Sequence, residues 1–176
     1  MRSVGLNSEA FATANDFLER FDQRSAGCLV LDIRMPGLSG LELQQRLLEL
    51  GVSIPIIFIT GHADVPMAVQ AMQKGAFAFI QKPFRDQELL ESISEAVISG
   101  NRERKKQETR AAVKARLQTL TRREQEVMDL VVAGKPNKVI AFELGVSQRT
   151  VEVHRARVME KMQARSLASL IRMNLL

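Results

Sequence analysis

The segment "LVLDIRMPGLSG" spans residues 29–40 and places one carboxylate, Asp32, at the end of an apolar run, directly before a turn. Short apolar runs alternate with amphipathic stretches over residues 8–96. The expected strands are 8–12, 28–31, 54–59 and 76–80, and the expected helices are 15–21, 40–49, 65–74 and 86–97. Because this alternation is typical of a parallel sheet with helices on both faces, the sequence predicts an α/β domain.

The composition changes after residue 98. The stretch "SGNRERKKQETRAAVKARL", residues 99–117, is rich in charged residues and in strong helix formers. It predicts a helical connector that extends the preceding helix, rather than a flexible linker. We therefore divide the chain into a first domain at 1–98, a helical linker at 99–118 and a second domain at 119–176.

The second domain has an all-helical pattern. The predicted elements are a helix from the capping box "TRRE" (121–124) to Gly134, a second capped by Asn137, a third from Ser147 to about Met162 and a fourth over 166–176. The second and third are short and are joined by the glycine-containing turn "LGVS". This pair is a candidate helix-turn-helix.

Charge separates the two halves of the chain. Residues 1–100 carry 8 Lys and Arg against 12 Asp and Glu, whereas residues 101–176 carry 17 against 8. A basic half favours a polyanionic partner, although a solvated basic surface would have the same composition. The single cysteine, Cys28, cannot form an internal disulfide, and no apolar run has the length of a membrane span. We expect a cytoplasmic protein.

Three polar side chains are expected at the carboxyl ends of neighbouring strands: Asp32, Thr60 and Lys82. Reactive groups collect at this edge of open α/β sheets. A carboxylate, a hydroxyl and an ammonium would suit phosphoryl transfer, with Asp32 as nucleophile and the other two holding phosphoryl oxygens. The equally simple alternative is a turn cap, an ordinary strand residue and a solvated lysine.

The third helix of the second domain predicts a nucleic-acid surface. Val151, Val158 and Met162 fall on one side at helical spacing and predict a buried stripe. The outward side carries Arg149, Glu152, Val153, Ala156 and Arg157. Arginines for phosphate or guanine, a carboxylate for cytosine and a valine for a thymine methyl suit the DNA major groove. The alternative is a solvated helix face.

Three stretches of the chain together resemble a response regulator of the FixJ/NarL type. They are "LVLDIRMPGLSGLEL", "PIIFITGHADVPMAVQAMQKGAFAFIQKPF" and "LTRREQEVMDLVVAGKPNKVIAFELGVSQRTVEVHRARVMEKM". The resemblance implies a flavodoxin-like receiver domain followed by a LuxR-type helix-turn-helix domain. It implies the following roles: Asp32 as phosphoacceptor, Thr60 as switch hydroxyl, Phe79 as switch aromatic, Lys82 as phosphate-binding lysine, the Arg34 carbonyl as a metal ligand, and a cis Lys82–Pro83 bond.

The same resemblance implies a DNA-binding transcription regulator. Base contacts would fall on Glu152, Val153 and Ala156, which agrees with the outward side of the third helix. Candidate phosphate contacts are Lys138, Thr150, His154, Arg155 and Arg165. The implied partners are a sensor histidine kinase and RNA polymerase. The apolar face of residues 166–176 is expected either to pack within the domain or to pair with a second copy, as a homodimer on an inverted repeat.

The sequence also departs from the family. Receivers of this type begin with a strand followed by an acidic pair that binds Mg²⁺, and we expect neither here, because "MRSVGL" at residues 1–6 resembles the end of the first helix, with Gly5 as its cap. Met1 is thus expected to start inside the domain. One carboxylate and one carbonyl make a poor Mg²⁺ site, so we expect impaired phosphorylation of Asp32. We also expect a gap, or two unpaired edges, where the strand is missing.

Two other functions are compatible with parts of the sequence. Aspartyl-phosphate phosphatases of the dehalogenase type also use a nucleophilic Asp after a strand, but they carry a second Asp two residues later, where Arg34 stands. We therefore expect no enzyme. A damaged receiver could instead serve as a phosphorylation-independent interaction or dimerisation module. His62 is expected to be a solvated loop residue.

Overall fold

The computed structural model describes residues 7–22, 27–61 and 65–175. The backbone forms two compact units, Met1–Arg104 and Lys105–Leu176, which are called the first and second unit below. Residues 1–6 and His62, on which two of the expectations rest, lie outside the described ranges.

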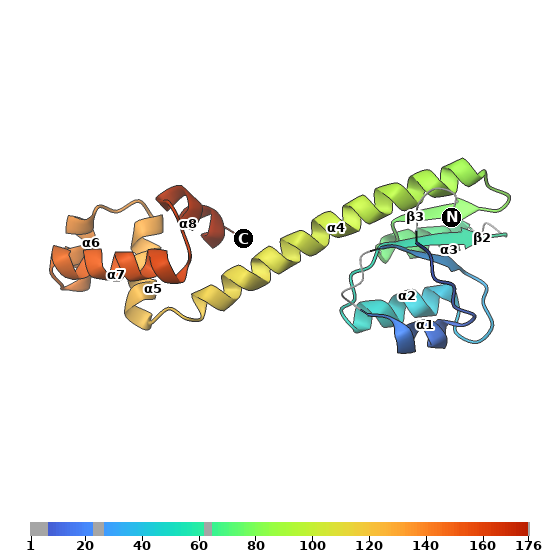
Figure 1. The fold of residues 1–176 in the computed structure, drawn as a ribbon, viewed down its shortest axis with the longest axis horizontal. Coiled ribbons are helices and arrows are strands. Elements are labelled where there is room, and N and C mark those ends of the chain that lie inside the picture. Colours follow the sequence, from blue (N-terminus) through green and yellow to red (C-terminus); the bar gives the residue numbers. More distant parts are fainter. Residues whose placement is uncertain (1–6, 23–26, 62–64, 176) are drawn as a thin grey trace. The chain divides into compact units, whose positions relative to one another are not determined.

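A parallel three-stranded sheet forms the centre of the first unit. Its strands are β1 (Leu29–Asp32), β2 (Ile56–Thr60) and β3 (Ala78–Gln81), in the order β1-β2-β3. The four helices of this region are α1 (Ala14–Arg20), α2 (Gly40–Glu49), α3 (Val65–Gln73) and α4 (Asp86–Leu117). The expected parallel α/β architecture is confirmed, with strand ends shifted by one or two residues (Figure 1).

Apolar side chains cover both faces of the sheet. One cluster joins Phe17 of α1 and Leu43 of α2 to Phe58 of β2. The other joins Ile93 of α4 to Ile57 of β2. Neighbouring residues 57 and 58 serve opposite clusters because side chains alternate along a strand. In Figure 1, α1 and α2 accordingly lie on one side of the sheet and the start of α4 on the other.

The expected strand at residues 8–12 is wrong. These residues are described but belong to no strand, and the sheet within the described ranges ends at β1. An extended segment becomes a strand only when a neighbour accepts its backbone hydrogen bonds, and no strand formed by the described residues pairs with 8–12. The expected gap in the domain is instead visible as a cavity between this segment and β1.

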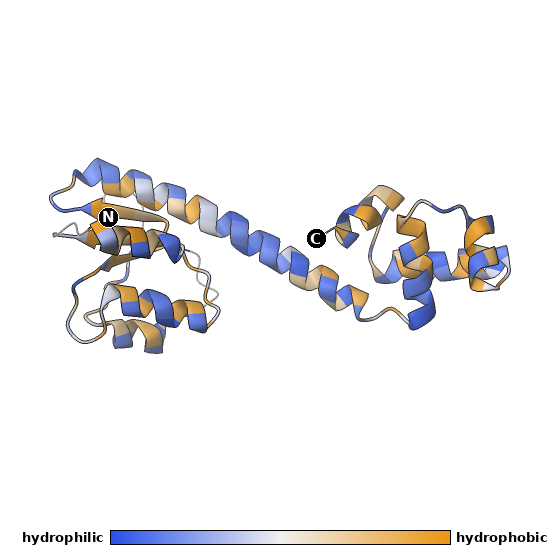
Figure 2. Cartoon of the chain, turned by 180° about the vertical axis from the view of Figure 1, so that it is seen from behind, coloured by the Kyte–Doolittle hydropathy of each residue, from blue (hydrophilic) through white to orange (hydrophobic). Residues whose placement is uncertain are grey.

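Helix α4 continues without a break for 32 residues. The expected helical connector is therefore correct, and its charged part belongs to the helix that begins at Asp86. Figure 2 shows that the middle part of α4 is hydrophilic, whereas both of its ends carry apolar residues. The apolar residue Val113, near its carboxyl end, is buried in the core of the second unit.

The second unit adds four helices: α5 (Arg122–Val132), α6 (Asn137–Leu144), α7 (Gln148–Lys161) and α8 (Leu167–Asn174). Thr121 and Ser147 cap α5 and α7 as expected, and Ser166 caps α8. Gly145 ends α6 in the left-handed conformation, which suits a residue without a β-carbon. The all-helical domain with its helix-turn-helix pair, α6 and α7, is confirmed.

The expected cap at Asn137 is wrong. Pro136 holds the N-cap position of α6 without a side-chain hydrogen bond, and Asn137 is the first helical residue. The side chain of Asn137 has a different partner, because its Oδ1 accepts a hydrogen bond of 2.8 Å from Arg155 Nη1 of α7. This bond links the two helices of the pair.

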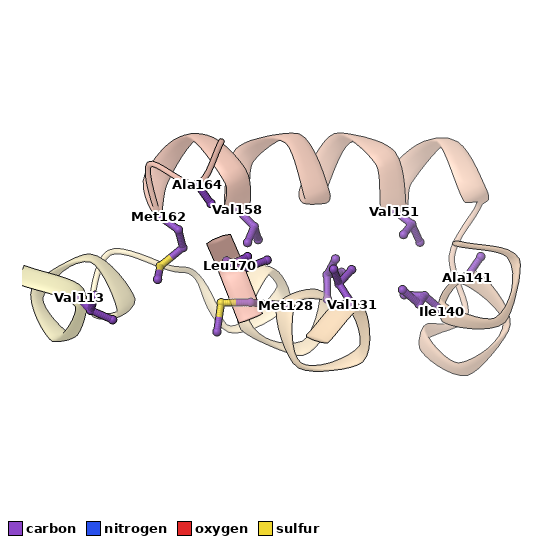
Figure 3. Close-up of a cluster of buried hydrophobic side chains, with 11 residues drawn as sticks. Val113, Met128, Val131, Ile140, Ala141, Val151, Val158, Met162, Ala164 and Leu170 are labelled. Atoms are coloured by element: carbon purple, nitrogen blue, oxygen red, sulfur yellow. The ribbon is translucent and has the colours of Figure 1, made fainter. Parts of the chain in front are cut away.

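Helix α7 packs its apolar stripe onto the other helices of this unit. Figure 3 shows Val151, Val158 and Met162 pointing from α7 into a cluster that includes Met128 of α5 and Leu170 of α8. The buried stripe predicted for this helix is therefore confirmed. It fixes the orientation of α7, so that the opposite side faces solvent.

Candidate functional site

The carboxyl ends of the three strands bring two predicted site residues into contact. Asp32 is the last residue of β1, and Lys82 follows β3 directly. The Nζ atom of Lys82 lies 2.8 Å from Oδ2 of Asp32, which makes an ion pair of partly exposed groups. Since parallel strands end at the same edge, two residues 50 positions apart in sequence meet there.

Thr60 lies between these two residues in the sheet. It ends β2 and is only 2% exposed, and its backbone carbonyl accepts a hydrogen bond of 2.7 Å from the Lys82 amide. Phe79, the candidate switch aromatic, is a residue of β3 that pairs with Phe58 of β2. Its partly buried side chain packs against the cluster that contains Phe17 and Leu43. The Lys82–Pro83 bond is cis, as the resemblance implied.

The loop after β1 is built tightly around Asp32. Its Oδ1 accepts a hydrogen bond of 3.0 Å from the Arg34 amide, which keeps the turn closed. Helix α2 begins at Gly40, where an added β-carbon would lie 2.5 Å from the backbone oxygen of Asp32. The glycine is therefore required by the close approach of α2 to this loop.

Two effects act on the pKa of Asp32 in opposite directions. Partial burial raises it, while the hydrogen bonds from Lys82 and from the backbone of Arg34 lower it. The hydrogen bonds together outweigh burial, so that the pKa lies below its ordinary value of 3.8. Asp32 is therefore an ionised carboxylate at neutral pH, as a nucleophile must be.

The donor set around Asp32 does not fit Mg²⁺. This ion requires six oxygen ligands in near-ideal octahedral geometry. Within the described ranges, no group of three or more His, Cys, Asp or Glu side chains could hold a metal. Both oxygens of Asp32 already accept hydrogen bonds, from Lys82 and from Arg34. The cation that pairs with this carboxylate in the described part of the chain is the Lys82 ammonium.

The outward side of α7 forms the second candidate site. Here the exposed residues are Arg149, Glu152, Val153, Ala156 and Arg157. Val153 is 40% exposed although it is apolar, and it stands among charged and small side chains. Arg149 Nη1 lies 3.5 Å from Glu152 Oε2, one helical turn along. These five residues are exposed while Val151 and Val158 of the same helix are buried, as the sequence predicted.

The candidate phosphate contacts differ in their exposure and in whether they already bond to other residues. Lys138 and Arg165 are exposed. Thr150 exchanges a hydrogen bond of 2.9 Å with the cap Ser147, and Arg155 holds Asn137. His154 is half-buried, and its Nδ1 is buried without a hydrogen-bond partner among the described residues. Arg155 therefore links α7 to α6.

One supporting interaction was not predicted. Glu124, the third residue of α5, is 2% exposed and accepts a hydrogen bond of 2.6 Å from Lys161 Nζ at the end of α7. Lys161 also donates to the carbonyl of Thr119 at 3.0 Å. The capping box signalled the role of Glu124, but nothing in the sequence pairs it with a lysine 37 positions later. This contact holds the carboxyl end of α7 in place.

Comparison with known proteins identifies both units. Residues 1–94 match the family described as response regulator receiver domain, and residues 118–174 match the bacterial regulatory proteins of the luxR family. The chain belongs to the FixJ/NarL-type response regulators. Receivers of this family accept signals from histidine kinases and generally use Mg²⁺, and their LuxR-type domains bind DNA.

Individual relatives cover nearly the whole chain. Nodulation protein W of Bradyrhizobium diazoefficiens is 51% identical over 173 residues, which are 98% of this chain and 76% of that protein. FixJ of Rhizobium meliloti is 52% identical over 152 residues, covering 85% and 73%. A solved structure of the response regulator StyR is similar over 99% of this chain and 88% of its own, with a TM-score of 0.89 and 45% identity.

Family membership bears on the other functions considered. The relatives are DNA-binding transcriptional regulators and not enzymes, which argues at the level of the family against an aspartyl-phosphate phosphatase. No helix in the described part of the chain is both long and apolar enough to cross a membrane.

Proposed function

We propose that this regulator acts in the cytoplasm and reads double-stranded DNA with α7. The observation that carries the proposal is the exposed side of α7, where Val153 stands between arginines and opposite a fully buried stripe. Val153 is not among the residues that form the core of this domain. In the major groove the same side chain contacts a thymine methyl group.

Base recognition is assigned to three residues of this side. Glu152 accepts a hydrogen bond from a cytosine amino group, and Val153 and Ala156 contact thymine methyl groups. Arg149 and Arg157 flank them and donate to guanine or to phosphate. In the unbound protein, Arg149 pairs with Glu152, so this pair must open or re-form against a base on binding.

Backbone contacts are assigned to residues around this helix. Lys138 and Arg165 are exposed cations that neutralise phosphates, and Thr150 donates from its hydroxyl. Arg155 bonds to Asn137 of α6, so it acts on phosphate only while also linking these two helices, and His154 is a half-buried candidate beside it. These contacts fix the register of α7 on the duplex and carry no sequence information.

A homodimer on an inverted repeat is proposed as the form that binds DNA. Leu167 and Leu175 of the α8 region are exposed, whereas Leu170 of the same helix is buried in the domain. One face of this segment thus packs within the domain, while the exposed leucines remain available to pair with a second copy. A two-fold pairing through α8 places two α7 helices on one side of the duplex, where a bound regulator also contacts RNA polymerase.

We assign the reception of the kinase signal to the site around Asp32, at the carboxyl ends of the strands in the first unit. A sensor histidine kinase would present a phosphohistidine, whose phosphorus is attacked by an Asp32 oxygen while the bond to the imidazole nitrogen breaks. Lys82 and Thr60 would hold the phosphoryl oxygens, and Phe79 would respond to the position of Thr60. We expect this transfer to be impaired in the present chain, because the described residues at Asp32 do not form a Mg²⁺ site.

The proposed DNA recognition is tested by selection from a random double-stranded library with the purified chain. The expected result is an enriched inverted repeat that is bound at least about 10³-fold more tightly than random DNA, with an affinity that falls as salt rises. A library that yields no enriched sequence, bound by a chain with intact secondary structure, would remove α7 as a reader of bases.

A further inference from the structure

The carboxyl ends of α4 and α7 meet within the second unit. Arg116 Nη1, in the last turn of α4, donates a hydrogen bond of 3.4 Å to the carbonyl of Met162, the residue at the C-cap of α7. Lys161, the last residue of α7, donates from Nζ to the carbonyl of Thr119, at 3.0 Å and two residues after α4 ends. Each helix end thus supplies a cation to a carbonyl at the other. We call these two hydrogen bonds the α4–α7 bridge.

Apolar side chains join the same two helix ends. Val113 of α4 is 5% exposed and Met162 is fully buried, and both belong to the core cluster of the second unit. Leu117, one turn after Val113, packs against that cluster. Figure 3 shows Val113 and Met162 among the side chains of this cluster. The end of α4 is therefore part of the core that also contains the buried stripe of α7.

Arg116 acts on a backbone group that α7 cannot satisfy by itself. The last four carbonyls of a helix have no partner inside the helix, and a cation beside them opposes the negative end of the helix dipole. Arg116 supplies both a donor and a positive charge at this place. Gln163, which follows the C-cap, adopts a φ of 53°, a conformation that favours glycine. The turn that ends α7 is therefore held there by its surroundings and not by the preference of its own residue.

These contacts extend the second unit beyond the region that the family model covers. The match to the luxR family begins at residue 118, whereas Val113 and Arg116 precede it. The compact second unit begins earlier, at Lys105. The end of α4 thus belongs to the second unit, although it lies outside the matched region.

Arg116 differs from the other cations of this part of α4. Arg110 and Lys114 are exposed, whereas Arg116 is partly buried and its guanidinium is bonded to the carbonyl of Met162. A cation that binds DNA phosphates has to reach the surface that faces the duplex. The contact of Arg116 with α7 indicates instead a role in the orientation of that helix.

We propose that Arg116 is a positioning residue for DNA recognition. By holding the carbonyl of Met162, it fixes the carboxyl end of α7 and with it the direction in which Glu152 and Val153 meet the base edges. A helix of 14 residues behaves as a rod about 21 Å long, so a shift at one end is carried to the other. Hydrogen bonds to bases depend on direction and distance, while the attraction of phosphates depends less on either. The proposal rests on the proposed reading of DNA by α7.

The experiment compares the full chain with Arg116→Met by fluorescence anisotropy, on the inverted repeat selected from the library and on random duplex DNA. Methionine keeps an unbranched side chain with a helix propensity close to that of arginine, but it has no charge and no donor. We expect affinity for the selected repeat to fall roughly fivefold, as for one lost hydrogen bond, and affinity for random DNA to change less than about twofold. The slope of affinity against salt should stay unchanged, because no phosphate contact is removed.

Two further variants separate positioning from charge. Arg110→Met removes the same charge from an exposed position of α4 and should leave the ratio of the two affinities unchanged. Arg116→Lys keeps a cation beside the end of α7 and should restore most of the ratio. If Arg110→Met lowers the ratio as much as Arg116→Met does, the effect is one of general charge and the proposal is overturned.

The ratio of the two affinities also separates positioning from stability. Partial unfolding lowers both affinities by the same factor, so their ratio is independent of the folded fraction. An Arg116→Met chain that loses both affinities equally would show a role in stability alone or, with a salt slope reduced by about 1, a phosphate contact, and either result overturns the proposal. A parent chain that selects no sequence would refute the reading of DNA by α7. A discriminating parent and an equally discriminating Arg116→Met variant would refute only the role of Arg116.

Discussion

The Nζ atom of Lys82 lies 2.8 Å from Oδ2 of Asp32, while the other oxygen of that carboxylate accepts the Arg34 amide at 3.0 Å. Both oxygens of the candidate phosphoacceptor are thus occupied by groups of the chain itself. The carboxylate is stabilised by the ammonium group of Lys82.

Removal of the Lys82 charge should raise the pKa of Asp32. In Lys82→Gln the burial that raises this pKa remains, while the hydrogen bond and charge that lower it are lost. The measurement is a ¹³C NMR titration of the Asp32 carboxyl group. Arg85→Gln, a nearby cation that is not among the groups acting on Asp32, is the control. An unchanged Asp32 titration in Lys82→Gln would show that the ion pair does not form in solution.

Glu124 should make the second unit sensitive to acid. The hydrogen bond from Lys161 is the main cause that lowers its pKa from 4.5 to about 2. A carboxylate whose pKa is lowered in the folded state contributes stability above its unfolded pKa and loses it as the pH falls through the folded value. We therefore expect the melting temperature of the second unit to fall between about pH 4.5 and 2 in scanning calorimetry.

Glu124→Gln separates this residue from the other carboxylates. At pH 7 the variant should lose about 2 kcal/mol, because a nearly buried, charge-assisted hydrogen bond is weakened. Its stability should also change less between pH 4.5 and 2 than that of the parent chain. Glu160→Gln, at an exposed position of the same unit, is the matched control. If both variants showed the parent acid profile, Glu124 would not be the responsible group.

Gln44 should stabilise the contact between α2 and α3. It is 1% exposed, and its Nε2 donates to the carbonyls of Ala71 and Lys74 at 3.1 and 3.3 Å, which satisfies the carboxyl end of α3. Gln44→Leu should destabilise the first unit by about 1 to 3 kcal/mol in urea unfolding. Its exposed neighbour provides the control, and Gln45→Leu should cost less than about 0.5 kcal/mol. Equal effects would mean that the two hydrogen bonds contribute nothing.

Two substitutions near α7 should affect DNA binding in different ways. Val153→Ala should reduce discrimination at one base position by about 1 kcal/mol and leave the salt dependence unchanged. Lys138→Gln should weaken binding to all sequences and reduce the slope of affinity against salt by about 1. Both follow from fluorescence anisotropy at several salt concentrations. The reverse assignment of effects would place Lys138 on a base and Val153 away from the groove.

Local patterns predicted most of the fold. The alternation before residue 98 predicted the parallel sheet, and the capping box at Thr121 and the cap at Ser147 predicted where α5 and α7 begin. These features depend on a few neighbouring residues, which is why the sequence alone reveals them. The approach of Asp32 to Lys82 was also predictable, because parallel strands end at one edge.

The wrong predictions concern residues whose structure depends on distant partners. Residues 8–12 have the composition of a strand, but within the described ranges no strand pairs with them. Asn137 is a good capping residue, but Arg155 on another helix binds its side chain. The pairing of Glu124 with Lys161 was missed for the same reason. Such contacts follow from tertiary structure and leave no local pattern in the sequence.

The most direct test of the Asp32 site is the incorporation of phosphate from a small phosphodonor, with and without Mg²⁺, into the folded chain and into its Asp32→Asn variant. With the Lys82 ammonium as the only cation at this carboxylate among the described residues, we predict little labelling and no increase on adding Mg²⁺. Efficient labelling that requires both Asp32 and Mg²⁺ would contradict this account and show that the chain assembles a metal site at Asp32.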